Sequence, residues 1–167
     1  MTLPACRSQD TDYSNLMGQE IGKGGSRKVY KVKCHPGWVL KECTVPGNGP
    51  NEQEAAVYFL AVTHQWHRLL NSLAKVHGIS QSGKFLIMEE LDTKPSLEGK
   101  TCNVMKELSD LKPNNFGVDS NGLIKSLDYV TLKDTLLLID ITGDTVPHTF
   151  STSTENNQLE GWKNLFS

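Results

Sequence analysis

A short polar run in the second half of the chain carries the side chains best suited to chemistry. Asp110, Lys112 and Asn115 lie within six positions of one another, and Asp128 follows after a turn. Transfer of a phosphoryl group from ATP needs a carboxylate to orient the attacking hydroxyl, a cation near the γ-phosphate and oxygen ligands for Mg²⁺. Asp110 fits the first role, Lys112 the second, and Asn115 with Asp128 the third. Asp140, after another apolar run, is the alternative metal ligand, although its spacing from Asp110 fits less well than that of Asp128.

A glycine-rich turn near the N-terminus is the second candidate site. Gly22, Gly24 and Gly25 precede Ser26 and Val29. Glycines lack a Cβ, so backbone amides in such a turn can approach an anionic group closely. Val29 is spaced to cover a nucleotide base, and basic residues outnumber acidic ones in residues 18–47, which favours phosphate. A plain glycine-rich hairpin is the alternative, since such a motif needs structural context.

Lys41 is the third candidate, because it directly follows the apolar residues Val39 and Leu40. On a strand this position can point inward, and a buried ammonium requires a partner. The following helix offers Glu54 and Glu52. Glu54 is preferred because it lies nearer the apolar stripe of that helix, and Glu52 is the fallback. A lysine that extends along the surface to water is the alternative interpretation.

The elements that must position these residues follow from hydrophobic periodicity and turn residues. Asn51 is the predicted N-cap of the longest helix, which is expected to break near 64–67, and residues 1–16 are a polar tail, loose or docked. Further elements are predicted as follows: three strands between 18 and 41; strands 76–79 and 84–89; a short helix 102–108; a hairpin of 115–118 and 123–127; a strand 132–141 that turns at Gly143 and Asp144; and a last helix 158–166.

Composition limits the possible classes of protein. Apolar residues make up 37% of the 167 residues and charged residues 22%, which is typical of a folded globular chain. The net charge of -2 argues against a dedicated nucleic-acid-binding protein. No apolar run is long enough to span a bilayer, so no membrane association is expected. The four cysteines form no CxxC pair and are expected to be free thiols in a reducing compartment.

Taken together, residues from about 18 to 130 resemble the protein kinase superfamily. Gly22 to Val29 is similar to the nucleotide loop, and Lys41 to the lysine that contacts ATP. Ile87 to Leu91 is similar to the hinge. The resemblance implies that Met88 is the gatekeeper and that backbone groups of Glu89 and Leu91 face adenine. It further implies an ATP- and Mg²⁺-dependent serine/threonine kinase.

The chain also departs from the kinase pattern. Arg27 stands in place of the third loop glycine, Leu108 and Ser109 in place of the histidine and arginine before the catalytic aspartate, and Tyr129 follows Asp128 where phenylalanine is usual. Few residues follow Asp128. We therefore expect an α+β, minimal kinase-like fold with a tail (1–17), a β-rich N-lobe and hinge with one main helix (18–91) and a much reduced C-lobe (92–167).

Reduced kinases of this kind occur among bacterial type III effectors, and the chain is most similar to the HopBF family. That resemblance implies a monomeric virulence factor, secreted into the host cytoplasm, that phosphorylates and inactivates the ninety-kilodalton heat-shock chaperone. It also implies a β-hairpin in place of the activation loop, here residues 132–146. The OspG/NleH effector kinases, which bind ubiquitin-charged conjugating enzymes, are the second resemblance. A pseudokinase-like module that binds a host protein is the rival function.

Overall fold

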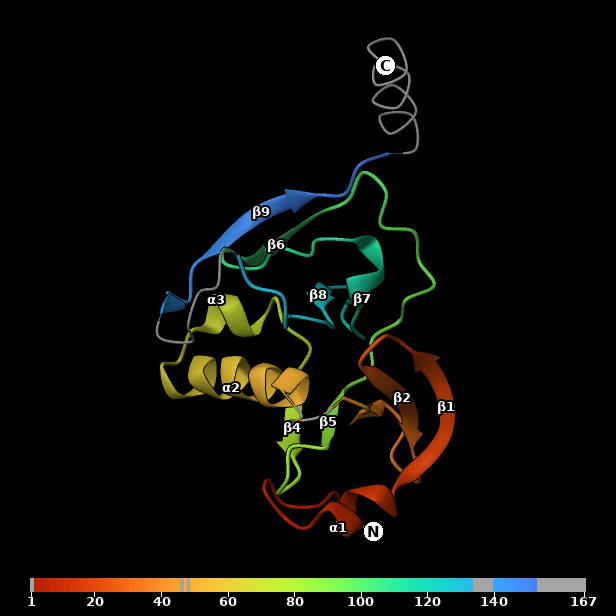
Figure 1. Cartoon of the computed structure of the whole chain (residues 1–167). Coiled ribbons are helices and arrows are strands. Elements are labelled where there is room, and N and C mark those ends of the chain that lie inside the picture. The colour runs from red at the N-terminus through yellow and green to blue at the C-terminus, as the bar shows by residue number, and fades with distance from the viewer. Residues whose placement is uncertain (1, 46, 48, 134–139, 153–167) are drawn as a thin grey trace, which may run out of the picture.

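The computed structural model describes residues 2–45, 47, 49–133 and 140–152. The chain has a mixed α+β fold in which strands predominate and helices are few (Figure 1). The helices are α1 (Asp10–Ser14), α2 (Gly49–Thr63) and α3 (His67–Leu70), with a 3₁₀ turn at Pro113–Asn115. The strands are β1 (Met17–Lys23), β2 (Arg27–Val32), β3 (Trp38–Cys43), β4 (Val76–Ile79), β5 (Phe85–Glu89), β6 (Thr101–Met105), β7 (Phe116–Val118), β8 (Ile124–Ser126) and β9 (Thr145–Thr149).

An antiparallel five-stranded sheet, in the order β1-β2-β3-β5-β4, forms the first half of the molecule. Its strands confirm those predicted between 18 and 41, at 76–79 and at 84–89. Side chains alternate between the two faces, as strand geometry requires. Val39 belongs to one buried cluster and Leu40 to the other. Lys41 therefore projects from the same face as Val39.

The N-terminal segment docks against one face of this sheet. Tyr13 of α1 is fully buried there with Leu40 and Ile87. The backbone N–H of Arg7 donates to the carbonyl of Ile79 at 2.7 Å. Gly78 allows the close approach, since a Cβ there would lie 2.9 Å from the Tyr13 hydroxyl. Of the two predicted states of the tail, the docked one is correct.

Helix α2 covers the opposite face. It begins at Gly49, so the prediction that Asn51 caps it is wrong. Pro50 lies in the first turn, where its missing N–H costs nothing. The buried Asn51 amide instead donates to the carbonyls of Lys41, Gly83 and Lys84, which fastens the start of the helix to the sheet. The predicted break is confirmed, because α2 ends at Thr63 and α3 starts at His67.

The predicted hairpin in the second half is confirmed as β7 and β8. Asp119 closes the turn by accepting hydrogen bonds from the N–H groups of Asn121 and Leu123, both at 2.9 Å. Lys125 makes ion pairs with Asp119 at 2.9 Å and with Glu89 at 3.1 Å. These ion pairs tie the hairpin to the end of β5.

The remaining segment corrects two predictions. Residues 101–105 form strand β6, although 102–108 was predicted to be a helix. β6 pairs with β9, and this long-range pairing overrides local helix propensity. Val146 pairs with Val104, so the expected hairpin of 132–146 is wrong about its second arm. Figure 1 shows the β6–β9 ribbon on the far side of the β7–β8 hairpin from the sheet.

Two predicted elements lie wholly or largely outside the described residues: the last helix (158–166) and the strand at 132–141. Leu132 itself forms an isolated bridge with Leu108. In the part of the chain that the structure describes, no helix has the length and apolar character needed to cross a membrane.

Candidate functional site

A cleft of about 930 Å³ opens between the sheet and the second half of the chain. Its volume is in the range of small-molecule sites, about 300–1,000 Å³. The sheet contributes Gly22, Val29 and Lys41, and the far wall includes Asn114 and Leu127. Residues 88–94, which link the two halves, close one end of it.

The linking segment carries the predicted hinge. Met88, Glu89 and Leu91 all line the cleft, and Met88 is fully buried. The Glu89 carboxylate accepts from Lys125 and from the backbone N–H of Lys75, so its side chain is held in place. The three residues therefore form a fixed wall with an apolar side chain at its inner end.

The glycine-rich turn joins β1 to β2 at the edge of the cleft. Gly22 and Val29 line the cleft, whereas Gly24, Gly25 and Ser26 form the tip of the turn. A Cβ at Gly22 or Gly24 would meet ordinary contacts of 3.7–3.8 Å, and one at Gly25 would meet nothing. None of the three has a positive φ. Neither close packing nor a positive φ therefore requires glycine at these positions. The absence of a Cβ there would let a ligand approach the backbone.

Lys41 and Glu54 form the buried ion pair at the base of the cleft. The Lys41 Nζ lies 2.9 and 3.1 Å from the two Glu54 carboxylate oxygens. It also donates to the carbonyl of Leu127 at 2.5 Å, which joins the sheet to the residue before Asp128. The preferred partner is thus correct, and the fallback Glu52 pairs with Arg7 at the surface.

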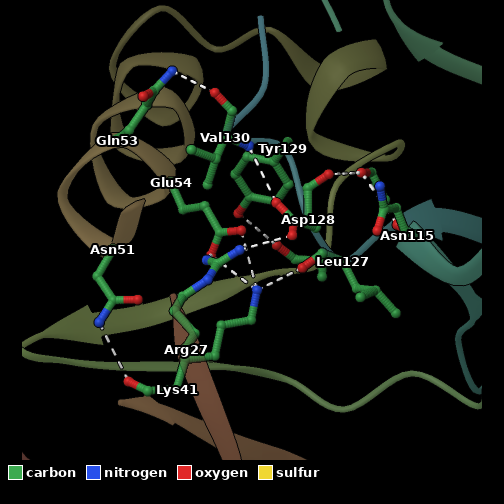
Figure 2. A network of polar contacts seen from close by, with 12 residues as sticks. Arg27, Lys41, Asn51, Gln53, Glu54, Asn115, Leu127, Asp128, Tyr129 and Val130 are labelled. Carbon is green, nitrogen blue, oxygen red and sulfur yellow. Dashed lines mark hydrogen bonds and ion pairs between the residues drawn. The ribbon is translucent and has the colours of Figure 1, made fainter. Parts of the chain in front are cut away.

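Arg27 is the residue that the sequence analysis missed. The kinase resemblance implied only a missing loop glycine at this position, yet the guanidinium of Arg27 is buried between two carboxylates (Figure 2). Nη1 lies 2.8 Å from a Glu54 oxygen, and Nη2 donates to Asp128 Oδ2 at 2.8 Å. Two cations and two carboxylates, from β2, β3, α2 and the loop after β8, therefore balance one another in a small volume. In the sequence, Arg27 is one of several basic residues near the glycine-rich turn, and nothing there indicates that it is buried.

The electrostatics of the cluster follow from burial and pairing. Burial lowers the pKa of Lys41, and the Glu54 carboxylate opposes that change without cancelling it. Burial would also lower the pKa of Arg27, but Glu54 and Asp128 outweigh it and raise the value. For Asp128 burial works to raise the pKa, whereas Arg27 and Lys41 bring it below the usual value. Asp128 is therefore an anion at neutral pH.

The predicted catalytic loop lies beside this cluster. Asp110 and Lys112 form an ion pair at 3.4 Å, with the Lys112 side chain largely exposed. The Asn115 amide donates to the carbonyl of Asp110 at 3.1 Å. The Asn115 carbonyl accepts from the N–H of Leu127 at 2.8 Å. The backbone thus holds the loop next to the segment that carries Asp128.

The donor set of Asn115 and Asp128 suits a hard divalent cation. The Asn115 amide nitrogen faces Asp110, and carboxylate and amide oxygens are ligands that Mg²⁺ takes together with phosphate oxygens. Within the described residues, no group of three His, Cys, Asp or Glu side chains could hold a metal unaided. A cation held by these two residues would therefore need further oxygen ligands. Asp140 is exposed, whereas Asp128 lies in the cluster.

Comparison of the chain with protein-family models gives no match, and comparison with curated proteins gives none either.

Proposed function

We propose that the chain is a minimal, ATP-dependent protein serine/threonine kinase. The observation that carries this proposal is the buried Lys41–Glu54 pair at the base of a nucleotide-sized cleft, joined through Leu127 to Asp128. Burying such a pair costs desolvation energy that apolar residues would not cost, so stability alone is a poor reason for it. A lysine held there is placed to meet phosphates that enter the cleft.

The roles of the other residues follow from their places. Val29 offers apolar surface to a base at the wall that contains the buried Met88, and the open space at Gly25 leaves room for phosphates near backbone amides. Asn115 and Asp128 would hold Mg²⁺, which supplies charge neutralisation of the phosphates when it is bound. Asp110 would orient the hydroxyl of the protein substrate, with Lys112 beside it.

The family-level part of the proposal depends on resemblance alone. We propose a secreted effector of the HopBF kind that acts on the ninety-kilodalton heat-shock chaperone, with the OspG/NleH type as the alternative. The rival function is a pseudokinase-like binding module. One contact favours that rival, because Arg27 already holds the carboxylate that a metal would need.

Nucleotide binding tests the proposal without knowledge of the protein substrate. Isothermal titration with MgATP should give binding by the wild-type chain and at least a tenfold loss in Lys41→Ala. Glu54 keeps its ion pair with Arg27 in that variant, so the fold should survive. Lys106→Ala, which removes an exposed lysine paired with Asp144 just after β6, is the matched control. Equal binding by all three proteins would contradict the proposal.

A further inference from the structure

Arg27 occupies the place where a cation would meet Asp128. Its Nη2 takes the Oδ2 oxygen of Asp128 at 2.8 Å, and the other oxygen, Oδ1, has a long contact of 3.4 Å with the N–H of Val130. The Asp128 side chain is 35% exposed, so a metal ion could reach it from solvent. In this arrangement the carboxylate is already neutralised by the chain itself.

The backbone of Arg27 is held in place, so only its side chain would move if a metal ion replaced it at Asp128. Its carbonyl accepts from the N–H of Gly24 at 2.8 Å, and its Cα pairs with that of Cys43 in the sheet. The neighbouring tip has open space, since nothing lies near a Cβ added at Gly25. The guanidinium can thus turn away without unpairing β2.

Loss of the guanidinium would expose Asp128 rather than dismantle the cluster. Lys41 holds both oxygens of Glu54 and the carbonyl of Leu127, so its hydrogen bonds are committed there. Glu54 would remain paired through Lys41. Asp128 would be left with the weak contact to Val130, which makes its carboxylate the group most in need of a cation.

We infer that Arg27 is a built-in cation that competes with a divalent metal for Asp128 and so lowers the metal affinity of the site. The inference rests on the proposed function for its meaning, because a kinase regulated in this way takes up metal mainly with nucleotide phosphates, which offer the guanidinium a new partner. Arg27 is thus a positioning residue whose side chain exchanges one anion for another.

Mn²⁺ binding to the nucleotide-free protein, followed by the electron paramagnetic resonance signal of free Mn²⁺, tests the competition directly. Arg27→Met should bind Mn²⁺ at least about tenfold more tightly than the wild type, since a charge-assisted hydrogen bond no longer has to be broken. Lys106→Met makes the same change in net charge outside the cluster and the glycine-rich turn, and it should leave the affinity unchanged. Adding Asp128→Asn to Arg27→Met should remove the gain.

Arg27→Lys keeps the charge but cannot bridge both carboxylates, so it should show a smaller gain and provides the test if Arg27→Met does not fold. Unchanged or weaker Mn²⁺ binding in the folded Arg27 variants would overturn the inference, as would an equal gain in Lys106→Met. A gain in Mn²⁺ affinity without any ATP binding by the wild type would support the competition and refute the kinase. ATP binding by the wild type without a gain in Mn²⁺ affinity in the Arg27 variants would refute the competition and leave the proposed kinase function standing.

Discussion

Glu54 is the residue on which the stability of the cluster depends most. It is fully buried and faces two cations, with Lys41 Nζ and Arg27 Nη1 at 2.9 and 2.8 Å from Oε2. Glu54→Gln keeps the shape of the side chain but turns a shared anion into a neutral group. Removing one partner of a buried ion pair typically costs about 3–5 kcal/mol, because an uncompensated charge stays behind.

Lys41→Met should lower the free energy of unfolding less than Glu54→Gln does. Glu54 then still has Arg27, and the loss is that of the hydrogen bonds from the ammonium to Glu54 and to the Leu127 carbonyl, about 1 kcal/mol for each partner. Glu54→Gln should therefore lower the free energy of unfolding by at least about 1 kcal/mol more than Lys41→Met. A typical domain is stabilised by only about 5–15 kcal/mol, so a difference of this size is measurable.

Urea unfolding followed by circular dichroism and tryptophan fluorescence measures both variants. Glu52→Gln is the matched control, since Glu52 pairs with Arg7 at the surface, and its cost should be below about 1 kcal/mol. If Lys41→Met proves as costly as Glu54→Gln, the assignment of Glu54 as the shared anion is refuted.

Three further predictions concern the metal ligand, acid stability and the docked N-terminal segment. In a thermal-shift titration, Asp128→Ala should weaken Mg²⁺-dependent ATP binding and Asp140→Ala should not; the reverse would move the metal site to Asp140. The folded-state pKa of Asp128 lies below its ordinary value, so its contribution to stability is present above about pH 4 and is lost as the pH falls through the folded-state pKa. Asp128→Asn should therefore reduce the loss of stability on the acid side of a plot of unfolding free energy against pH. Gly78→Ala should cost about 1–3 kcal/mol in urea unfolding, since its Cβ would lie 2.9 Å from the hydroxyl of the fully buried Tyr13; a neutral effect would show that the segment moves aside freely.

Much of the sheet could be predicted from sequence because its signals are local. Strand-like runs on either side of the Ser82–Gly83 turn located β4 and β5, and Asp119 to Gly122 located the turn of the β7–β8 hairpin. The same local evidence failed for β6. Its conformation depends on pairing with β9, some forty positions later, and no short-range pattern carries that information.

The candidate site divides in the same way. The Lys41–Glu54 pair was predictable because both residues lie next to apolar positions of adjacent elements. Arg27 was not, since its two carboxylate partners come from α2 and from the segment after β8. In the sequence, Arg27 was noted only as a departure from the kinase pattern. Its position between the two carboxylates depends on the tertiary fold, which no local pattern shows.

Transfer of the γ-phosphate itself tests the central claim most directly. The purified chain is incubated with radiolabelled ATP, Mg²⁺ and a eukaryotic cell lysate, beside Lys41→Ala and Asp110→Ala. The account predicts a labelled lysate protein with the wild type and at least a hundredfold less label with either variant. Equal labelling by the wild type and both variants, or no labelling by a wild-type chain that binds ATP, would contradict it.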